Sequence, residues 1–128
     1  MNTTTRNFIL LSAVLGFLGV AIGAFGAHGL KTTLEANGRE DTFETATRYH
    51  IYHALALLGV AWLSSITTER YVKLAGWLMF SGALIFSGAL YVLALFNVGM
   101  MGVVAPIGGA LMLVGWLCVG LTALNAKS

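Results

Sequence analysis

Apolar residues fill four long segments of the chain, and short polar stretches separate them. These segments predict helices over about residues 8–30, 42–65, 72–96 and 104–124. A helix rises about 1.5 Å per residue, so about 20 residues cross the hydrocarbon core of a bilayer, and each segment reaches that length. The pattern therefore predicts an all-α fold, an integral membrane antiparallel four-helix bundle that forms a single membrane domain over residues 1–128.

Small residues recur at helical spacing within three of the predicted spans. In the first span they are Ser12, Gly16, Gly19, Gly23 and Gly26; in the third, the series is Trp77, Ser81, Leu84, Gly88, Tyr91 and Leu95; in the fourth, it is Gly108, Met112, Gly115, Val119 and Thr122. Steps of three and four residues keep each series on one side of its helix. In lipid, a glycine lets another backbone approach closely, so we expect these stripes to be helix-packing surfaces.

The composition agrees with a membrane protein and excludes several other classes. Of the 128 residues, 58% are hydrophobic and 9% are charged, whereas soluble domains carry roughly 25% charged residues. The net charge of +2 includes no basic stripe, so we expect no nucleic-acid binding. The lone cysteine, Cys118, lies in an apolar segment and is interpreted as a small buried hydrophobe. The first apolar run is too long for the hydrophobic region of a signal peptide, and it is interpreted as a membrane helix.

One substantial hydrophilic stretch, residues 31–48, lies between the first two predicted spans. Asn37-Gly38 is a turn signal within it, and Asp41 with Glu44 matches a capping box, which predicts a helix start near residue 42. Glu44 and Arg48 lie one helical turn apart and are expected to form an ion pair. Farther along the chain, Pro106 is expected in the first turn of the fourth span, where proline is tolerated.

Basic residues outside the spans give an orientation. One side of the membrane would hold Arg6, Arg70, Lys73 and Lys127, and the other would hold Lys31, Arg39 and Arg48. Positively charged residues favour the cytoplasmic side, so the count of four against three predicts that both termini are cytoplasmic.

Most of the residues that could carry chemistry gather toward one end of the predicted bundle. They are His28, Tyr49, His53, Ser87 and Tyr91, with His50 and the loop residues Met100 and Met101 on the same side. Polar groups inside a membrane protein mark function more often than they do in a soluble protein. His28 points about 150° away from the glycine stripe at about 100° per residue, so it reaches His53 only if the helix bends or packs beside the stripe.

Three interpretations of this cluster remain open. In the first, these side chains form hydrogen bonds between helices and bind no ligand. In the second, His28 and His53, with His50 or the methionines, hold a metal, a haem or a quinone. His50-x-x-His53 contains no carboxylate, which makes it a weak metal signature. In the third, the cluster lines a proton or small-solute path, but the predicted spans contain no deeply placed Asp or Glu to support one.

The chain resembles the YgdD/YwdK family of small membrane proteins through five ordered motifs. They are GAFGAH at 23–28, Tyr49-x-x-x-His53, FSGALY at 86–91, APIGG at 105–109, and Gly115-Trp116. The positions that match the family motifs are Gly26, His28, Tyr49, His53, Ser87, Gly88, Tyr91, Pro106, Gly108, Gly109 and Trp116. The resemblance implies a four-helix protein of unknown function, located in bacteria in the cytoplasmic membrane. It does not include His50, which ranks below His53 as a ligand for this reason.

These observations predict a non-catalytic protein: an accessory, scaffold or assembly component of larger membrane machinery, or a homo-oligomer. We find no Walker loop, no zinc-protease motif, no Ser-His-Asp set and no paired carboxylates in a span, so we expect no enzymatic activity. No cofactor is expected, and the lipid bilayer is the expected environment. The alternative is a small metal-, haem- or quinone-binding membrane protein that uses His28 and His53.

Overall fold

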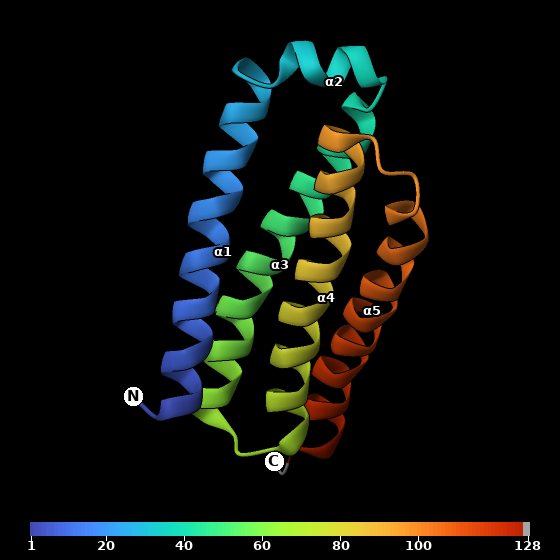
Figure 1. Ribbon diagram of the computed structural model, residues 1–128. Helices are drawn as coiled ribbons and strands as arrows, with labels where there is room; N and C mark the ends of the chain where they lie inside the picture. Colours follow the sequence, from blue (N-terminus) through green and yellow to red (C-terminus); the bar gives the residue numbers. More distant parts are fainter. Residues whose placement is uncertain (127–128) are drawn as a thin grey trace.

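The computed structural model describes residues 1–126, and over this range the regular structure is helical (Figure 1). The helices are α1 (Thr3–His28), α2 (Lys31–Asn37), α3 (Glu40–Ile66), α4 (Arg70–Phe96) and α5 (Met101–Asn125). By length and composition, α1, α3, α4 and α5 can each cross a membrane. The predicted all-α membrane fold is confirmed, and each of the four predicted spans overlaps one long helix.

The long helices run antiparallel to their neighbours in the order α1, α3, α4, α5, and α1 and α5 lie on opposite sides of the molecule (Figure 1). α1 packs mainly on α3, and α5 packs mainly on α4; within residues 1–126, α1 and α5 do not form a packed pair. In the most apolar window of each span, 39% of residues are buried in α3 and in α4, against 22% in α1 and 28% in α5. The bundle is therefore open, with α3 and α4 at its centre.

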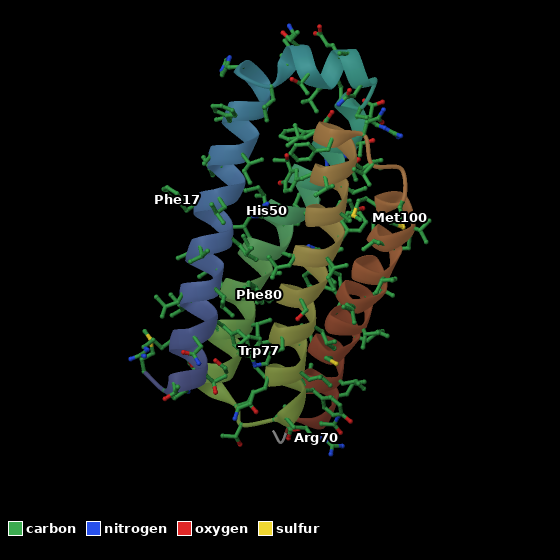
Figure 2. All side chains as sticks on the ribbon, in the orientation of Figure 1. Phe17, His50, Arg70, Trp77, Phe80 and Met100 are labelled. Carbon is green, nitrogen blue, oxygen red and sulfur yellow. The ribbon has the colours of Figure 1, made fainter. Side chains whose placement is uncertain are left out.

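The outer helices leave wide apolar faces outside the protein core. Phe17 on α1 is 75% exposed, and Figure 2 shows it pointing away from the other helices. Val103, Leu113 and Leu117 on α5 are also exposed. Such faces suit contact with acyl chains or with other membrane helices, because neither requires polar surface.

The closest helix contact joins α4 to α5. A Cβ atom built on Gly82 would lie 2.7 Å from the carbonyl oxygen of Gly108, and one on Gly108 would lie 2.6 Å from the carbonyl oxygen of Gly82. A Cβ on Gly115 would lie 2.8 Å from Cγ of Met79. Because two of these contacts are to backbone atoms, side chains larger than hydrogen cannot be accommodated there without separating the helices.

The glycines of α1 lie against α3. A Cβ on Gly23 would lie 3.1 Å from Cγ2 of Thr47, and Cβ atoms on Gly19 and Gly26 would meet the side chains of Ile51 and Phe43. Gly16 has more room, since the nearest atom to its Cβ position is Cβ of Ala54 at 4.0 Å. In the same stripe, Ser12 Oγ donates a hydrogen bond of 2.6 Å to the carbonyl oxygen of Ala54.

The stripe predicted for the third span is wrong. A Cβ on Gly88 would meet no atom within 4 Å, and the side chains of Trp77 and Leu84 are about half exposed. α4 has neighbours on two sides, α3 and α5, so its buried positions do not follow one 4-3 series. Its contacts use a different set of residues, Val72, Ala75, Gly76, Met79, Gly82 and Ala83.

Short capping and turn interactions explain where the helices begin. Asn2 accepts a hydrogen bond of 2.8 Å from the backbone N–H of Thr5, which starts α1 five residues before the predicted position. The carbonyl groups of Val98, Gly99 and Met100 accept i+3 hydrogen bonds that start α5 with a tight turn. Pro106 is therefore the sixth residue of α5, and its predicted place in the first turn is wrong.

The hydrophilic stretch forms a helix of its own, α2, which was not predicted. The turn predicted at Asn37-Gly38 is confirmed, since Gly38 takes a left-handed conformation with φ of 63°. The predicted capping box is wrong, because α3 begins at Glu40 and Asp41 already lies inside its first turn, where its charge favours the helix N-terminus. Asn37 Nδ2 donates to the carbonyl oxygen of Ala94 at 2.9 Å, so α2 also caps the end of α4.

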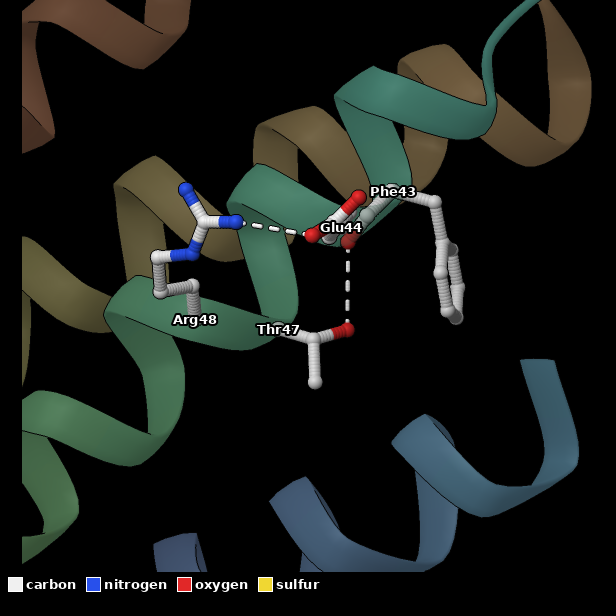
Figure 3. A network of polar contacts seen from close by, with 4 residues as sticks. All are labelled: Phe43, Glu44, Thr47 and Arg48. Atoms are coloured by element: carbon white, nitrogen blue, oxygen red, sulfur yellow. Dashed lines mark hydrogen bonds and ion pairs between the residues drawn. The ribbon is translucent and has the colours of Figure 1, made fainter. Parts of the chain in front are cut away.

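The predicted Glu44–Arg48 ion pair is confirmed. Nη2 of Arg48 lies 2.7 Å from Oε1 of Glu44, and Thr47 Oγ1 donates to the carbonyl oxygen of Phe43 at 3.1 Å. Figure 3 shows both contacts on α3. The ion pair lies on exposed surface at the α2 end of the molecule. Arg6, Arg70 and Lys73 lie at the opposite end, while Lys127, counted for the orientation, is outside the described residues.

Candidate functional site

His50 joins three helices at the centre of the structure. Its Nε2 lies 2.7 Å from the carbonyl oxygen of Leu15 on α1, and its Nδ1 lies 2.9 Å from the hydroxyl of Tyr91 on α4. A carbonyl oxygen can only accept, so Nε2 carries the proton and Nδ1 of the neutral ring accepts from the Tyr91 hydroxyl. The side chain is 6% exposed, and Figure 2 shows it within the bundle.

His53 joins α3 to α5. Its Nδ1 donates to the backbone carbonyl of Tyr49 at 2.8 Å, and its Nε2 accepts from the indole N–H of Trp116 at 3.1 Å. The imidazole is buried, and its ring lies edge to face with the indole ring at a centroid distance of 6.1 Å. This side chain provides the hydrogen bond between α3 and α5.

Both imidazole rings use both of their nitrogens within the protein. A metal or haem iron binds histidine through a nitrogen lone pair, and in each ring that lone pair accepts a hydrogen bond from Tyr91 or Trp116. Binding a metal would therefore require breaking one of these bonds. In the described part of the chain, no group of three or more His, Cys, Asp or Glu side chains is placed to hold a metal ion.

The other predicted cluster residues fall into two places. Ser87 Oγ donates to the carbonyl oxygen of Ala46 at 2.8 Å, which ties α4 to α3 near the Tyr91–His50 bond. Tyr49 lies on the other side of α3, is 39% exposed, and its ring packs edge to face on Phe86 at 5.1 Å. The structure thus brings Ser87 and Tyr91 to His50, and Tyr49 to His53.

His28 does not join either group. It is exposed at the last residue of α1. Gly26 packs against Phe43, and His53 lies ten residues beyond Phe43, which is about 15 Å along the axis of α3. The sequence left open whether His28 meets His53, and in the structure the two are apart, because the antiparallel helices place the end of α1 beside the start of α3. Met100 is also exposed, in the loop before α5 (Figure 2).

Sequence reasoning ranked His50 too low, although a signal for its burial exists. His50 belongs to a series of buried α3 residues at three- and four-residue spacing, Phe43, Ala46, His50, Ala54 and Leu57. A polar residue within such a series faces the protein core rather than lipid. Tyr91, its partner, could be identified from sequence only by its similar depth in the membrane.

A groove opens between α3, α4 and α5 beside His53. It has a volume of about 570 Å³ and opens to the outside of the bundle. The lining residues are Tyr49, His53, Phe86, Pro106, Gly109, Ala110, Met112, Leu113 and Trp116. Five positions of the family motifs, Tyr49, His53, Pro106, Gly109 and Trp116, meet at this groove. It is a largely apolar, aromatic site with few polar atoms, which suits an apolar ligand better than an ionic one.

Comparison with known proteins gives relatives along most of the chain. A UPF0382 membrane protein of Staphylococcus saprophyticus is 46% identical over 110 residues, which cover 86% of this chain and 90% of the relative. A UPF0382 membrane protein of Staphylococcus epidermidis is 44% identical over 118 residues, covering 92% and 95% of the two chains. The UPF0382 membrane protein YwdK of Bacillus subtilis is 38% identical over 119 residues, covering 92% and 96%.

No solved structure matches the chain significantly. The profile of the family described as "Protein of unknown function (DUF423)" matches residues 22–109, which include Gly23 and Gly26 of α1, both buried histidines and the start of α5. The resemblance to the YgdD/YwdK family is thereby confirmed. From these matches and its four potential membrane spans, the chain belongs to the DUF423 family of membrane proteins, a family whose function is unknown.

Proposed function

We propose that this protein is a non-catalytic component of a larger membrane assembly and acts by packing its helices against those of a partner. The observation that carries the proposal is the open order of the helices, which leaves α1 and α5 each with one packed side and one wide apolar side. The described segments between the long helices are short, and the largest is the seven-residue helix α2 with its flanking turns. Most of the surface available to a partner therefore lies in the membrane.

The histidine geometry supports a structural role over a catalytic one. Each buried imidazole is held in one tautomer by two hydrogen bonds, and these bonds connect α3 to α1, α4 and α5. Side chains used in this way fix helix positions in lipid, where every polar group needs a partner. We accordingly propose no resident metal or haem.

Extraction from native membranes into polymer-bounded lipid discs tests the assembly role. We expect the tagged protein to elute as a species larger than one 13.5 kDa chain in its disc, with a stoichiometric companion or with further copies of itself. Mass spectrometry of the intact particles shows whether the additional mass is a different protein or further copies of this chain. A monomeric particle with no stoichiometric companion, obtained across several gentle extraction conditions, would contradict the proposal.

Elemental analysis and an optical spectrum of the purified protein test the cofactor part of the proposal. We expect no metal in stoichiometric amount and no haem band, because the nitrogen lone pairs of His50 and His53 are already used. His53→Ala serves as the comparison. A metal or a haem band that is present in the original protein and lost in His53→Ala would overturn this part.

We also propose that the protein lies in the cytoplasmic membrane with both termini in the cytoplasm. Two single-cysteine variants in a Cys118→Ala background test it: Thr68→Cys between α3 and α4, and Ala36→Cys on α2, both at exposed positions. We expect a membrane-impermeant maleimide to label Ala36→Cys on intact cells and Thr68→Cys only after lysis. The reverse pattern would place the termini outside.

A further inference from the structure

A furrow runs over α4 between α3 and α5, and one hydrogen bond crosses it. The bond joins Trp116 Nε1 to His53 Nε2 at 3.1 Å. The 570 Å³ groove lies on one side of this bridge, and a second groove of about 330 Å³, lined by residues that include Gly59, Met79 and Val119, lies on the other. A helix with its side chains is about 10–12 Å wide, so a straight partner helix cannot lie at the floor of the furrow without breaking the bridge. A ligand that fills the larger groove with this bond intact must therefore be smaller than a helix.

Aromatic rings form much of the wall of the larger groove. Tyr49 and Phe86 pack edge to face at 5.1 Å and 63°, and His53 and Trp116 do so at 6.1 Å and 70°. The faces and edges of such rings attract the complementary parts of another planar ring, which adds to simple burial of apolar area. An acyl chain in the groove would gain from burial of its apolar area but not from attraction between aromatic rings.

Part of the opposite wall, on α5, is built from small or compact residues, while Met112 and Leu113 line the rest. Pro106, Gly109 and Ala110 follow one another along this side of the groove. A Cβ on Gly109 would have as its nearest atom Cδ1 of Phe86 at 3.6 Å, an ordinary contact distance. The glycine is therefore not required by close backbone packing at this position, in contrast to Gly108, and the Phe86 ring lies beside it.

A polar group lies at the edge of the groove. Tyr49 is 39% exposed, and its backbone carbonyl, not its hydroxyl, receives the hydrogen bond from His53. The phenolic hydroxyl can therefore donate to a ligand. Arg48 directly precedes Tyr49 and pairs with Glu44 near the start of α3, so this hydroxyl is close to the membrane interface.

We propose that this groove binds the ring of a quinone-type lipid that enters from the bilayer. The planar ring lies against the aromatic wall on the open side of the groove, one ring carbonyl accepts a hydrogen bond from the Tyr49 hydroxyl, and the apolar tail extends into lipid. The inference concerns binding only, and it holds whether or not the protein is part of an assembly.

Fluorescence quenching by a short-chain quinone tests the proposal. The protein contains three tryptophans, and Trp62→Phe with Trp77→Phe leaves Trp116, at the groove, as the only reporter. The full chain is placed in phosphatidylcholine discs and titrated with decylubiquinone. We expect saturable quenching of Trp116 fluorescence, whereas a quinone that only collides with the protein from the lipid would quench in linear proportion to its concentration.

Two further variants of this reporter protein separate the groove from the rest of the surface. Gly109→Leu fills the groove without a backbone clash and is expected to abolish the saturable phase. Gly120→Leu, on the same helix at a position with no atom within 4 Å of its Cβ, is expected to retain it. Tyr49→Phe is expected to weaken binding about three- to tenfold, which corresponds to the loss of one hydrogen bond. Elution volume and helical content are checked for each variant.

The proposal is overturned if quenching is linear in the original reporter protein, or if Gly109→Leu and Gly120→Leu bind the quinone equally. Brominated phosphatidylcholine provides the competing test. If it quenches Trp116 and decylubiquinone does not displace it, the groove holds an ordinary acyl chain instead. Should Gly109→Leu fail to fold, Tyr49→Phe still decides the matter, since an unchanged affinity would remove the hydrogen bond on which ring recognition depends.

Discussion

Replacing Gly108 by leucine is expected to destabilise the protein by about 3 kcal/mol or more, the upper range for forcing extra atoms into a packed interior. The physical reason is the contact between α4 and α5. A Cβ on Gly108 would lie 2.6 Å from the carbonyl oxygen of Gly82 and would also meet the backbone of Phe86. Backbone atoms cannot rotate away as a side chain can, so the two helices must separate along their length.

Unfolding in mixed micelles of a mild detergent and dodecyl sulfate, followed by tryptophan fluorescence, measures this loss. Gly108→Ala is expected to show a smaller loss in the same direction, because alanine adds only the Cβ atom to the contact and leucine adds three further carbon atoms. Gly120→Leu on the same helix is the matched control: it makes the same chemical change at an open position and is expected to change stability by less than about 0.5 kcal/mol. Equal effects at positions 108 and 120 would show that close backbone approach does not stabilise the α4–α5 pair.

The sequence predicts the four long helices of this protein well because one strong physical effect governs them. A membrane helix needs a continuous apolar run, and such runs remain visible whatever the helix packs against. The sequence predicted the start of α5 less well, since this start depends on i+3 hydrogen bonds to the carbonyl groups of the loop at Val98–Met100. α2 was missed for a similar reason: seven residues of mixed character carry little periodic signal, and Asn37 gains its partner, the carbonyl of Ala94, only in the folded chain.

The choice of neighbours is what the sequence could not provide. Gly88 belongs to a regular series of residues on α4, yet a side chain there would enter open space, while Gly82 outside that series meets α5. Spacing identifies the residues that share one side of a helix, but it does not say which side a partner covers. In water, exposure to solvent would distinguish the two sides by polarity. In lipid both sides are apolar, so this distinction is lost.

For the same reason, the sequence could not show which histidines face a neighbouring helix. His28 and His53 were placed at the same end of the bundle because antiparallel helices bring the end of one span near the start of the next, and this reasoning fixed their depth only roughly. α1 ends beside Phe43, well before His53, and the side chain that turns inward at the α1–α3 contact is His50. His53 lies at the middle of α3 and His28 at the end of α1, and contact between particular side chains also depends on helix rotation. Only the packed structure specifies that rotation.

His50→Ala carries the second large expected effect, a loss of about 3 kcal/mol of stability. The change removes a buried ring and creates a cavity between α1, α3 and α4, and it leaves the Tyr91 hydroxyl without its acceptor at 2.9 Å. Large-to-small changes in a core cost about 2–5 kcal/mol, and loss of a hydrogen-bond partner adds to the cost. Ser87→Ala, which removes one hydrogen bond to Ala46 and few atoms, is the control and is expected to lose about 1 kcal/mol.

A double-mutant cycle separates the hydrogen bond from the cavity. His50→Phe keeps an aromatic ring but cannot accept from Tyr91, and Tyr91→Phe removes the donor. If the His50–Tyr91 bond stabilises the fold, the two changes are less than additive by about 0.6 kcal/mol, the average for hydrogen bonds between membrane helices, and by at most about 1.7 kcal/mol. Strict additivity, with a large effect of His50→Ala, would mean that ring packing alone holds the three helices together at this point. A negligible effect of His50→Ala would contradict the central role of His50 in joining α1, α3 and α4.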